Sequence, residues 1–438
     1  MTTMLQLRFH FFCFFCFAFT CPDISFAVEN WPCWRGPRGD GTSHETRLPT
    51  RWSSDEHVRW KVDLPGEGHA SPIVWENRIF IVSCIPETQA RVLIALDRNS
   101  GQKLWQKTVV ESPLETKHGL NSYASSTPAT DGELVYVTFL KSNDRMVTAT
   151  NVSKPREVTL GDMVVAAYDF EGNQRWMVQA GEFVSVHGFC SCPVLFEDLL
   201  IINGDHDGDS YIVALDKKSG RQAWKIPRPN KTRSYVTPIV RHFGGKTQMI
   251  LSGDKSVTSY DPRTGAPIWN MDGPTEQFVA SLVDDGSRVF LTAGFPDKHI
   301  LAIDPTGTGN VTESHILWRS KRNCAYVPSP IVVGKFFLLT SDEGVASCYD
   351  TVSGEQLWVA RLEGHYSTSP VTAAGLVYFT SDAGITKIVR PGSKFDLVAT
   401  NALQEECFAS VAVSQGSLFF RTAKHLICIE RLLSSQLE

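Results

Sequence analysis

The sequence lacks an excess of charge of one sign, and it lacks any window that keeps a helical hydrophobic period. The formal net charge of its 438 residues is -5 at pH 7. This near balance gives no electrostatic reason to expect nucleic acid or an acidic membrane surface as a partner. In place of helical periods, short β-branched and aromatic runs alternate with Gly, Asp, Asn and Pro. Such a pattern is typical of an all-β protein.

Local signatures of catalysis and of metal binding are also absent. No nucleophile motif accompanies the scattered His and Asp residues, so neither a Ser-His-Asp set nor any catalytic residue is predicted. The glycine-rich GTGTGN at 305–310 is not followed by a helical pattern that would bind phosphate. Cys190-Ser-Cys192 lacks the second cysteine pair of a finger-like site. No metal site is therefore predicted.

Three alternating carboxylates in NGDHDGDSY are the nearest approach to a metal motif. They belong to Asp205, Asp207 and Asp209. The alternation resembles a calcium loop, but the bidentate Glu that such a loop needs further on is missing. A polar turn between two strands is the favoured interpretation, because tight turns favour Asp and Gly.

The first 27 residues differ in composition from the rest of the chain. Arg8 and His10 precede the apolar run FFCFFCFAF, and small residues stand near Ala27, where a signal peptidase would cut. The run is shorter than the roughly 20 residues that span a bilayer. We therefore expect a signal peptide over 1–27, export to the periplasm or the medium, and no transmembrane anchor after cleavage. An uncleaved anchor and lipidation at Cys21 are the alternatives.

One sequence motif recurs along the chain. IALDRNSGQKLW ends at Trp105, VALDKKSGRQAW at Trp224, TSYDPRTGAPIW at Trp269 and SCYDTVSGEQLW at Trp358. Each copy follows a Ser/Thr/Pro-rich strand start, such as HASPIV at 69–74, and a second apolar strand, such as RIFIVS. Eight units of this kind, two of them weaker, follow one another. A spacing of about 40–70 residues suits four short strands per unit.

Each residue type of the repeated motif has a structural role. Asp and Ser/Thr side chains bond backbone N–H groups in a tight turn, and Gly supplies the positive φ that the turn needs. The Trp that follows buries a large flat face against the next sheet, and sheets that bury one another in this way close into a ring. The sequence therefore predicts an all-β fold, an eight-bladed β-propeller of four-stranded antiparallel blades. The expected blade-docking residues are Trp60, Trp105, Trp176, Trp224, Trp269, Trp318 and Trp358.

The ends of the chain suggest how the ring closes. The last unit has only three evident strands, whereas VRWKVDL at 58–64 stands before any first strand and carries a Trp. We expect this front segment to supply the outer strand of the last blade, with a coiled or disordered arm as the alternative. The propeller domain would then cover 58–438. Residues 28–57, which include WRGPRGDG, would form an N-terminal segment that packs on it.

Two units depart from the pattern. The seventh has no Trp, and Leu397 stands near its place. The second contains an insertion, KSNDRMVTATNVSKPREVTLG at 141–161, for which a surface loop is expected.

The repeats carry a family resemblance. The repeated motif resembles the repeats of pyrroloquinoline quinone (PQQ)-like eight-bladed propellers. It reads Ala-x-Asp-x-x-Ser/Thr-Gly-x-x-x-Trp, from Ala95 to Trp105 and from Ala214 to Trp224. NWPCWRGPRGDGTS, NSYASSTPATDGELVYV and KHLICIE are similar to segments of exported bacterial PQQ-like repeat proteins, many of them from planctomycetes. The likeness covers nearly everything after residue 30. It implies the propeller fold and leaves the function open.

The resemblance implies two different functions, because one kind of relative is an enzyme and the other is not. Quinoprotein alcohol and glucose dehydrogenases hold PQQ and calcium in the funnel, and the alcohol enzymes place two adjacent cysteines beside the quinone. Here Ser191 separates Cys190 from Cys192, and the sequence contains no adjacent pair. The other relative is the propeller subunit of the outer-membrane β-barrel assembly machinery, which has no catalytic role.

Aromatic and imidazole residues stand at comparable places just before the first strands of the eight units. They are His69, Tyr123, His187, Tyr235, Phe278, Tyr326, Tyr366 and Phe408. If first strands line the central channel, these side chains ring one mouth of it and can bind a planar or sugar-like ligand. The alternative is that they wedge between blades as core. Polar residues stand nearby, namely Asn121, Arg233, Arg322 and Asn323.

These observations predict a non-catalytic exported module for binding or scaffolding. Its ligand surface would be the channel mouth, its partner a protein or a glycan, and it would need no cofactor. The alternative is a PQQ-dependent quinoprotein oxidoreductase that uses a divalent cation and acts on an alcohol or sugar. A third interpretation, suggested by the aromatic ring, is a carbohydrate-processing accessory.

Overall fold

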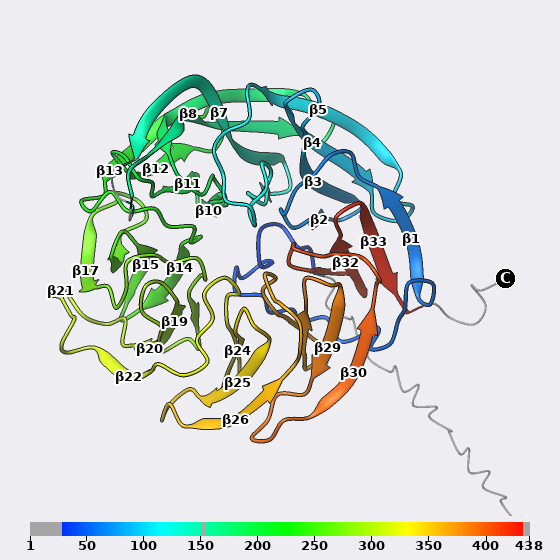
Figure 1. Cartoon of the computed structure of the whole chain (residues 1–438), viewed down its shortest axis with the longest axis vertical. Helices are drawn as coiled ribbons and strands as arrows, with labels where there is room; N and C mark the ends of the chain where they lie inside the picture. The colour runs from blue at the N-terminus through cyan, green and yellow to red at the C-terminus, as the bar shows by residue number, and fades with distance from the viewer. Residues whose placement is uncertain (1–28, 150–151, 153, 432–438) are drawn as a thin grey trace, which may run out of the picture.

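The computed structural model describes residues 29–149, 152 and 154–431, so the expected signal peptide at 1–27 lies outside the described residues. Within the described ranges, strands form eight sheets that stand radially around a central channel, and no helix occurs (Figure 1). The eight-bladed propeller expected from the repeats is confirmed. In the same part of the chain, no helix is long and apolar enough to cross a membrane.

Blades 1 to 4 follow in chain order, and their strands are given from the channel outward. Blade 1 contains β2 (Ile73–Trp75), β3 (Arg78–Ile85), β4 (Ala90–Asp97) and β5 (Lys103–Glu111). Blade 2 contains β6 (Ala129–Thr130), β7 (Leu134–Ala149), β8 (Arg156–Asp169) and β9 (Gln174–Val184). Blade 3 contains β10 (Val194–Phe196), β11 (Leu199–Gly204), β12 (Tyr211–Asp216) and β13 (Gln222–Pro227). Blade 4 contains β14 (Ile239–Phe243), β15 (Lys246–Gly253), β16 (Ser256–Tyr260) and β17 (Pro267–Asp272).

Blades 5 to 8 complete the ring. Blade 5 contains β18 (Val283–Asp284), β19 (Val289–Ala293), β20 (His299–Ile303) and β22 (Ile316–Ser320). Blade 6 contains β23 (Ile331–Val333), β24 (Phe336–Thr340), β25 (Val345–Asp350) and β26 (Gln356–Arg361). Blade 7 contains β27 (Val371–Ala373), β28 (Leu376–Thr380), β29 (Ile385–Val389) and β30 (Leu397–Ala402). Blade 8 contains β31 (Ala412–Ser414), β32 (Ser417–Arg421), β33 (His425–Glu430) and β1 (Val58–Asp63).

The glycine-rich segment in blade 5 has a structural role that the sequence did not suggest. Its residues Gly309–Asn310 form β21, which pairs in parallel with β17 and adds a fifth strand to blade 4. The connection between β20 and β22 therefore reaches back over the neighbouring blade.

The two ends of the chain meet in one sheet, as expected. β1 pairs antiparallel with β33, so that Trp60 lies opposite Cys428 and Asp63 opposite His425. The outer strand of blade 8 thus comes from the start of the propeller domain and its other three strands from the end. The backbone links β1 to blade 1, and the pairing of β1 with β33 closes the ring by hydrogen bonds.

Each docking tryptophan reaches the turn of the following blade. The indole Nε1 of Trp105 in blade 1 donates to the carbonyl of Phe170 in blade 2, at 2.8 Å. Trp60 of blade 8 bonds the carbonyl of Arg98 in blade 1 in the same way, at 2.9 Å. The other five bonds are Trp176 to Lys217, Trp224 to Pro262, Trp269 to Pro305, Trp318 to Thr351 and Trp358 to Gly392. In six of the seven cases the acceptor follows the Asp that begins the turn between third and fourth strands.

Two features of the turn require glycine in the repeated motif. Gly220 has a φ of 72°, which suits the turn. A Cβ on Gly220 would lie 2.6 Å from the ring of Trp176 in the preceding blade, and a Cβ on Gly101 would lie 2.7 Å from Trp60. The turn therefore offers the indole ring a flat backbone face as well as a carbonyl acceptor.

The apolar core is divided into clusters that lie between neighbouring blades. One cluster joins blades 1 and 2, another joins blades 2 and 3, and a larger one spans blades 3 to 5. Blades 7, 8 and 1 share a cluster that also takes in Trp31 and Trp52 of the N-terminal segment. The blades are therefore held mainly by their contacts with one another.

Blade 7 is the exception, and the prediction for Leu397 was wrong in register. The position that holds Trp in other blades, two residues after a bulge, is occupied by Ala399, which lies opposite Ile388. Leu397 is exposed instead, at the place of Lys103 in blade 1. The missing ring is supplied by Trp52, which stacks on Tyr378 with ring centroids 6.4 Å apart.

The insertion in blade 2 is a hairpin, so the prediction of a surface loop was wrong. β7 and β8 pair from Lys141 opposite Asp162 to Ala149 opposite Arg156, with a register shift between Ser142 and Met146. Alternate residues form a small core of their own, made of Ala149, Val158, Leu160, Val184 and Val186. The period-2 pattern of MVTA and REVTL carries the strand signal in this stretch.

The N-terminal segment enters the ring and crosses the channel (Figure 1). Trp31 forms a bridge with Val74 of blade 1, and Thr42 forms one with Thr372 of blade 7. The guanidinium of Arg35 donates to the carbonyl of Pro330, at the start of blade 6, at 2.6 Å. The segment therefore contacts blades on several sides and closes the channel from within.

Candidate functional site

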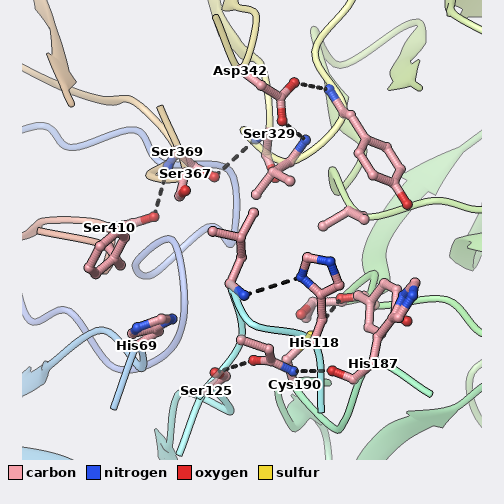
Figure 2. A pocket seen from close by; sticks show the side chains of 18 of the residues that line it. His69, His118, Ser125, His187, Cys190, Ser329, Asp342, Ser367, Ser369 and Ser410 are labelled. Carbon is pink, nitrogen blue, oxygen red and sulfur yellow. Dashed lines mark hydrogen bonds between the residues drawn. The ribbon is translucent and has the colours of Figure 1, made fainter. Parts of the chain in front are cut away.

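A pocket of about 330 Å³ opens at one mouth of the channel (Figure 2). Its walls come from the loops that precede the first strands of the blades. Its lining includes His69, His118, Asn121, Ser125, His187, Cys190, Tyr235, Tyr326, Asp342, Ser367 and Phe408. The size and the mixture of aromatic with polar groups are those of a site for a small ligand.

Five of the eight residues expected at the mouth line this pocket. They are His69, His187, Tyr235, Tyr326 and Phe408. Phe278 and Tyr366 do not, and the expectation for them was wrong. Both are fully buried between blades as members of apolar clusters, which is the alternative that the sequence left open. Tyr123 is also outside the lining and packs against the cluster between blades 1 and 2.

A girdle of small side chains joins the blades at the base of the pocket. It consists of the residue two places before each first strand or its equivalent, namely Ser71, Thr127, Cys192, Thr237, Ser281, Ser329, Ser369 and Ser410. In the regular case, the backbone N–H of one member donates to the side chain of the next, as from Ser329 to Ser369 at 3.0 Å. Six such bonds occur around the ring. This explains the repeated Ser/Thr before the strand starts, and it shows Cys192 in the place of a hydroxyl.

Between blades 8 and 1 the girdle is replaced by a buried arginine. Arg421 donates to the carbonyl of Val82 at 2.6 Å and to the hydroxyl of Ser83 at 3.0 Å, both in blade 1. Burial lowers the pKa of Arg421 to about 9. The seam where the chain ends meet is thus bonded near the channel as well as at the rim.

The floor of the pocket is formed by the N-terminal segment. Trp34 lies in the lining, and the guanidinium of Arg35 stands 5.7 Å from its ring centroid. Arg35 is 1% exposed, and burial lowers its pKa to about 10. The segment therefore contributes to the wall of the pocket on the side of the channel interior.

One side of the pocket is rich in imidazole. The rings of His118 and His187 meet edge to face at 5.3 Å, and His187 stacks on Tyr235 at 6.0 Å. Burial lowers the pKa of His69 and that of His187 to about 4, and the charges of Arg421 and Arg233 respectively act in the same direction. Both rings are therefore neutral at pH 7, and each offers one donor and one acceptor.

On the other side of the pocket, two carboxyl groups accept hydrogen bonds from the backbone of the pocket loops. Asp342 accepts the backbone N–H groups of Tyr326 at 2.8 Å and of Val327 at 3.1 Å (Figure 2). Asp382 accepts the N–H of Ser367 at 2.7 Å and faces His365 at 2.6 Å. Both aspartates follow second strands. Asp342 holds the loop that presents Tyr326 to the pocket, and Asp382 holds the loop that presents His365 and Ser367.

Several lining residues had no signal in the repeats. His118 and Leu120 lie in the long connection from β5 to β6, where Asn121 donates to the carbonyl of His187 at 2.8 Å. Of the polar residues expected nearby, Asn121 lines the pocket, whereas Arg233 pairs with Asp207 at 2.6 Å. Arg322 and Asn323 lie outside the lining. A connection that is longer than those of other units was the available sequence signal.

The alternating aspartates and the close cysteine pair have structural partners. Asp205 and Asp207 lie in the turn between β11 and β12, and Asp205 pairs with the buried Arg228 at 2.8 Å. Cys190 and Cys192 are free thiols, as are the other six cysteines of the described residues. Within the described ranges, no group of three His, Cys, Asp or Glu side chains is placed to hold a metal ion.

The sequence matches one family model, described as outer membrane protein assembly factor BamB. The matched residues are 47–157, 140–296, 208–329 and 296–392. Together they cover most of the propeller. No curated protein sequence matches the chain.

Solved structures with the same fold include both kinds of relative. BamB from Moraxella catarrhalis shares 13% identity at a TM-score of 0.59, over 86% of this chain and 98% of its own. Quinohemoprotein alcohol dehydrogenase from Comamonas testosteroni shares 11% identity at a TM-score of 0.61, over 91% of this chain and 80% of its own. A europium-containing methanol dehydrogenase shares 11% identity at a TM-score of 0.59, over 91% and 90%. At these identities the likeness shows the fold alone.

Proposed function

We propose that this chain is a binding or scaffolding module rather than an enzyme. The premise is that it belongs to the PQQ-like repeat family described as outer membrane protein assembly factor BamB. The observation that carries the proposal is the state of the ionisable groups in the pocket. Asp342 and Asp382 bond the backbone of the pocket loops, and His69 and His187 are held neutral by burial. Ser367 donates its hydroxyl to Asp382 at 3.0 Å, but within the described residues no imidazole of the lining bonds a hydroxyl or thiol of the lining. The arrangement therefore supports binding better than nucleophilic catalysis.

The rest of the molecule is consistent with a module that binds a partner. Seven of the eight blade junctions carry an indole hydrogen bond, and the pocket lies at one mouth of the channel. The leader over 1–27 supports export to the periplasm or the medium, where a protein or a glycan would be the partner. The name of the family, an assembly factor, favours a protein partner for the scaffold.

A PQQ-dependent oxidoreductase is the second candidate, and the fold shared with the two dehydrogenases favours it. PQQ carries three carboxylates, so its site needs cationic side chains and a divalent ion. The described lining contains neither Lys nor Arg, and its carboxyl group, Asp342, is one whose pKa burial raises. Ser191 keeps Cys190 and Cys192 from forming an adjacent pair. The donor set of the pocket therefore does not fit PQQ with calcium.

A dye-linked oxidation assay separates the two candidates. The mature protein would be incubated with PQQ and calcium and then given primary alcohols or aldoses as substrates. A binding module gives no dye reduction above that of a sample without protein. Turnover that follows the amount of protein and depends on PQQ would reject the proposal.

A further inference from the structure

We infer that the mouth pocket binds the ring of a neutral saccharide. The inference rests on the proposed function, because it names the class of ligand for the same pocket. It is carried by three properties of the lining, which are its aromatic faces, its neutral hydrogen-bonding groups and its lack of cations.

The aromatic faces come from blades that are well separated around the ring. Phe408 precedes blade 8 and contacts His69 with ring centroids 4.8 Å apart, and Tyr235 precedes blade 4 and contacts His187 at 6.0 Å. Phe408 and Tyr235 thus stand four blades apart, half-way around the ring. Trp34 adds a third aromatic surface at the floor. Each of these rings is part-buried and can cover the apolar C–H face of a sugar ring.

The polar groups suit hydroxyls better than charges. A hydroxyl both donates and accepts, and a neutral imidazole does the same through its two nitrogens. His118 uses Nδ1 to accept the N–H of Leu120 at 3.2 Å, which leaves Nε2 for a ligand. Neither ring nitrogen of His187 makes a hydrogen bond within the described part of the chain. Several neutral donors and acceptors therefore converge on one small volume.

The charges of the lining select against acidic ligands. The described lining residues include no Lys or Arg, and their carboxyl group, Asp342, accepts two backbone N–H bonds while burial raises its pKa. An anionic ligand would meet this carboxylate without a cation in contact to offset it. A neutral hexose or hexosamine avoids that cost, and the pocket of about 330 Å³ has room for it.

Saturation-transfer NMR on the mature protein tests the inference. The neutral probes would be glucose, N-acetylglucosamine and cellobiose, and glucuronate would be the matched anion. We expect transfer to at least one neutral probe, weaker transfer to glucuronate, and about tenfold weaker binding after Tyr235→Leu, since a lost contact of this kind is worth about one decade of affinity. Phe395→Leu is the matched control, because Phe395 is a partly exposed aromatic residue outside the pocket.

The possible failures are distinct from failure of the proposed function. Tighter binding of glucuronate, equal binding by Tyr235→Leu, or no transfer to any neutral probe would each overturn the saccharide inference. If the dye-linked assay is silent in those cases, the binding module stands with another ligand class. Dye-linked turnover with PQQ would instead remove the proposed function itself.

Discussion

The junction between blades 7 and 8 differs from the other seven junctions of the ring. At the seven, a Trp of one blade bonds a carbonyl of the next and lies over its turn. At the junction of blades 7 and 8 the ring belongs to Trp52, which stacks on Tyr378 and contacts Phe420 at a tilt. Its indole nitrogen is buried with no partner.

The reason for the difference lies in how the ring closes. β33 and β1 of blade 8 are the two ends of the domain, so no turn joins them and no turn carbonyl faces blade 7. A Trp on β30 would therefore lack its acceptor. The N-terminal segment fills the space instead, and the same segment supplies Trp34 to the floor of the pocket. Closure of the ring and formation of the site thus depend on one stretch of chain.

Removing residues 29–57 while keeping β1 should have the largest effect. The deletion takes away the buried Trp31 and Trp52, and each large core truncation costs about 3–5 kcal/mol, which together approaches the whole stability of a typical domain. We expect loss of the cooperative thermal transition seen for a chain that begins at residue 28. A transition that keeps its midpoint would show that the segment is an appendage.

Truncating a regular docking residue should rank next. Trp269 is 1% exposed, and its Nε1 bonds the carbonyl of Pro305, so Trp269→Ala should cost about 3–5 kcal/mol in urea unfolding. Leu317→Ala, at an exposed position on the outer strand of blade 5, serves as the control and should change stability by less than about 0.5 kcal/mol. Similar losses for the two variants would contradict the docking role.

Replacing Trp by Phe isolates the hydrogen bond and sharpens the comparison. Trp176→Phe removes the bond to Lys217 and leaves that carbonyl without its donor, whereas Trp52→Phe removes no bond. We expect Trp176→Phe to be more destabilising than Trp52→Phe by about 1 kcal/mol. Equal losses measured by chemical unfolding would mean that the indole bond does not distinguish the junctions.

The smallest effect at neutral pH concerns the pocket imidazoles. The pKa values of His69 and His187 are about 4 in the fold against 6.5 in the unfolded chain, so the unfolded state binds more protons between these values. Stability should be unaffected above pH 7 and should fall as the pH drops from about 6.5 to 4. The double variant H69Q/H187Q should flatten this part of the profile, while an unchanged slope would place the acid sensitivity elsewhere.

The sequence predicted the ring because its repeats encode local rules. The Asp-x-x-Ser/Thr-Gly turn, the docking Trp and the displaced β1 strand each follow from residue types at fixed spacing. The role of Trp52 could not be predicted, because it depends on which turn is missing at the closure. The hairpin at 141–161 was missed since its alternation is short and polar residues interrupt it.

The site was less predictable than the ring for a related reason. The register before each first strand located His69, His187 and Tyr235 but could not tell them from Phe278, because the tilt of each loop decides whether a side chain faces the channel or the next blade. His118 comes from the connection between β5 and β6, which is longer than the corresponding connections of the other units.

Calorimetric titration of the mature protein with PQQ, with and without calcium, tests the central claim most directly. The claim is that the mouth pocket binds a ligand but is not a cofactor site. The structure predicts no saturable heat in either condition, because the lining offers no cation and no divalent-ion site. Saturable binding that requires calcium and disappears in Tyr235→Leu would contradict the account and make the pocket an active site.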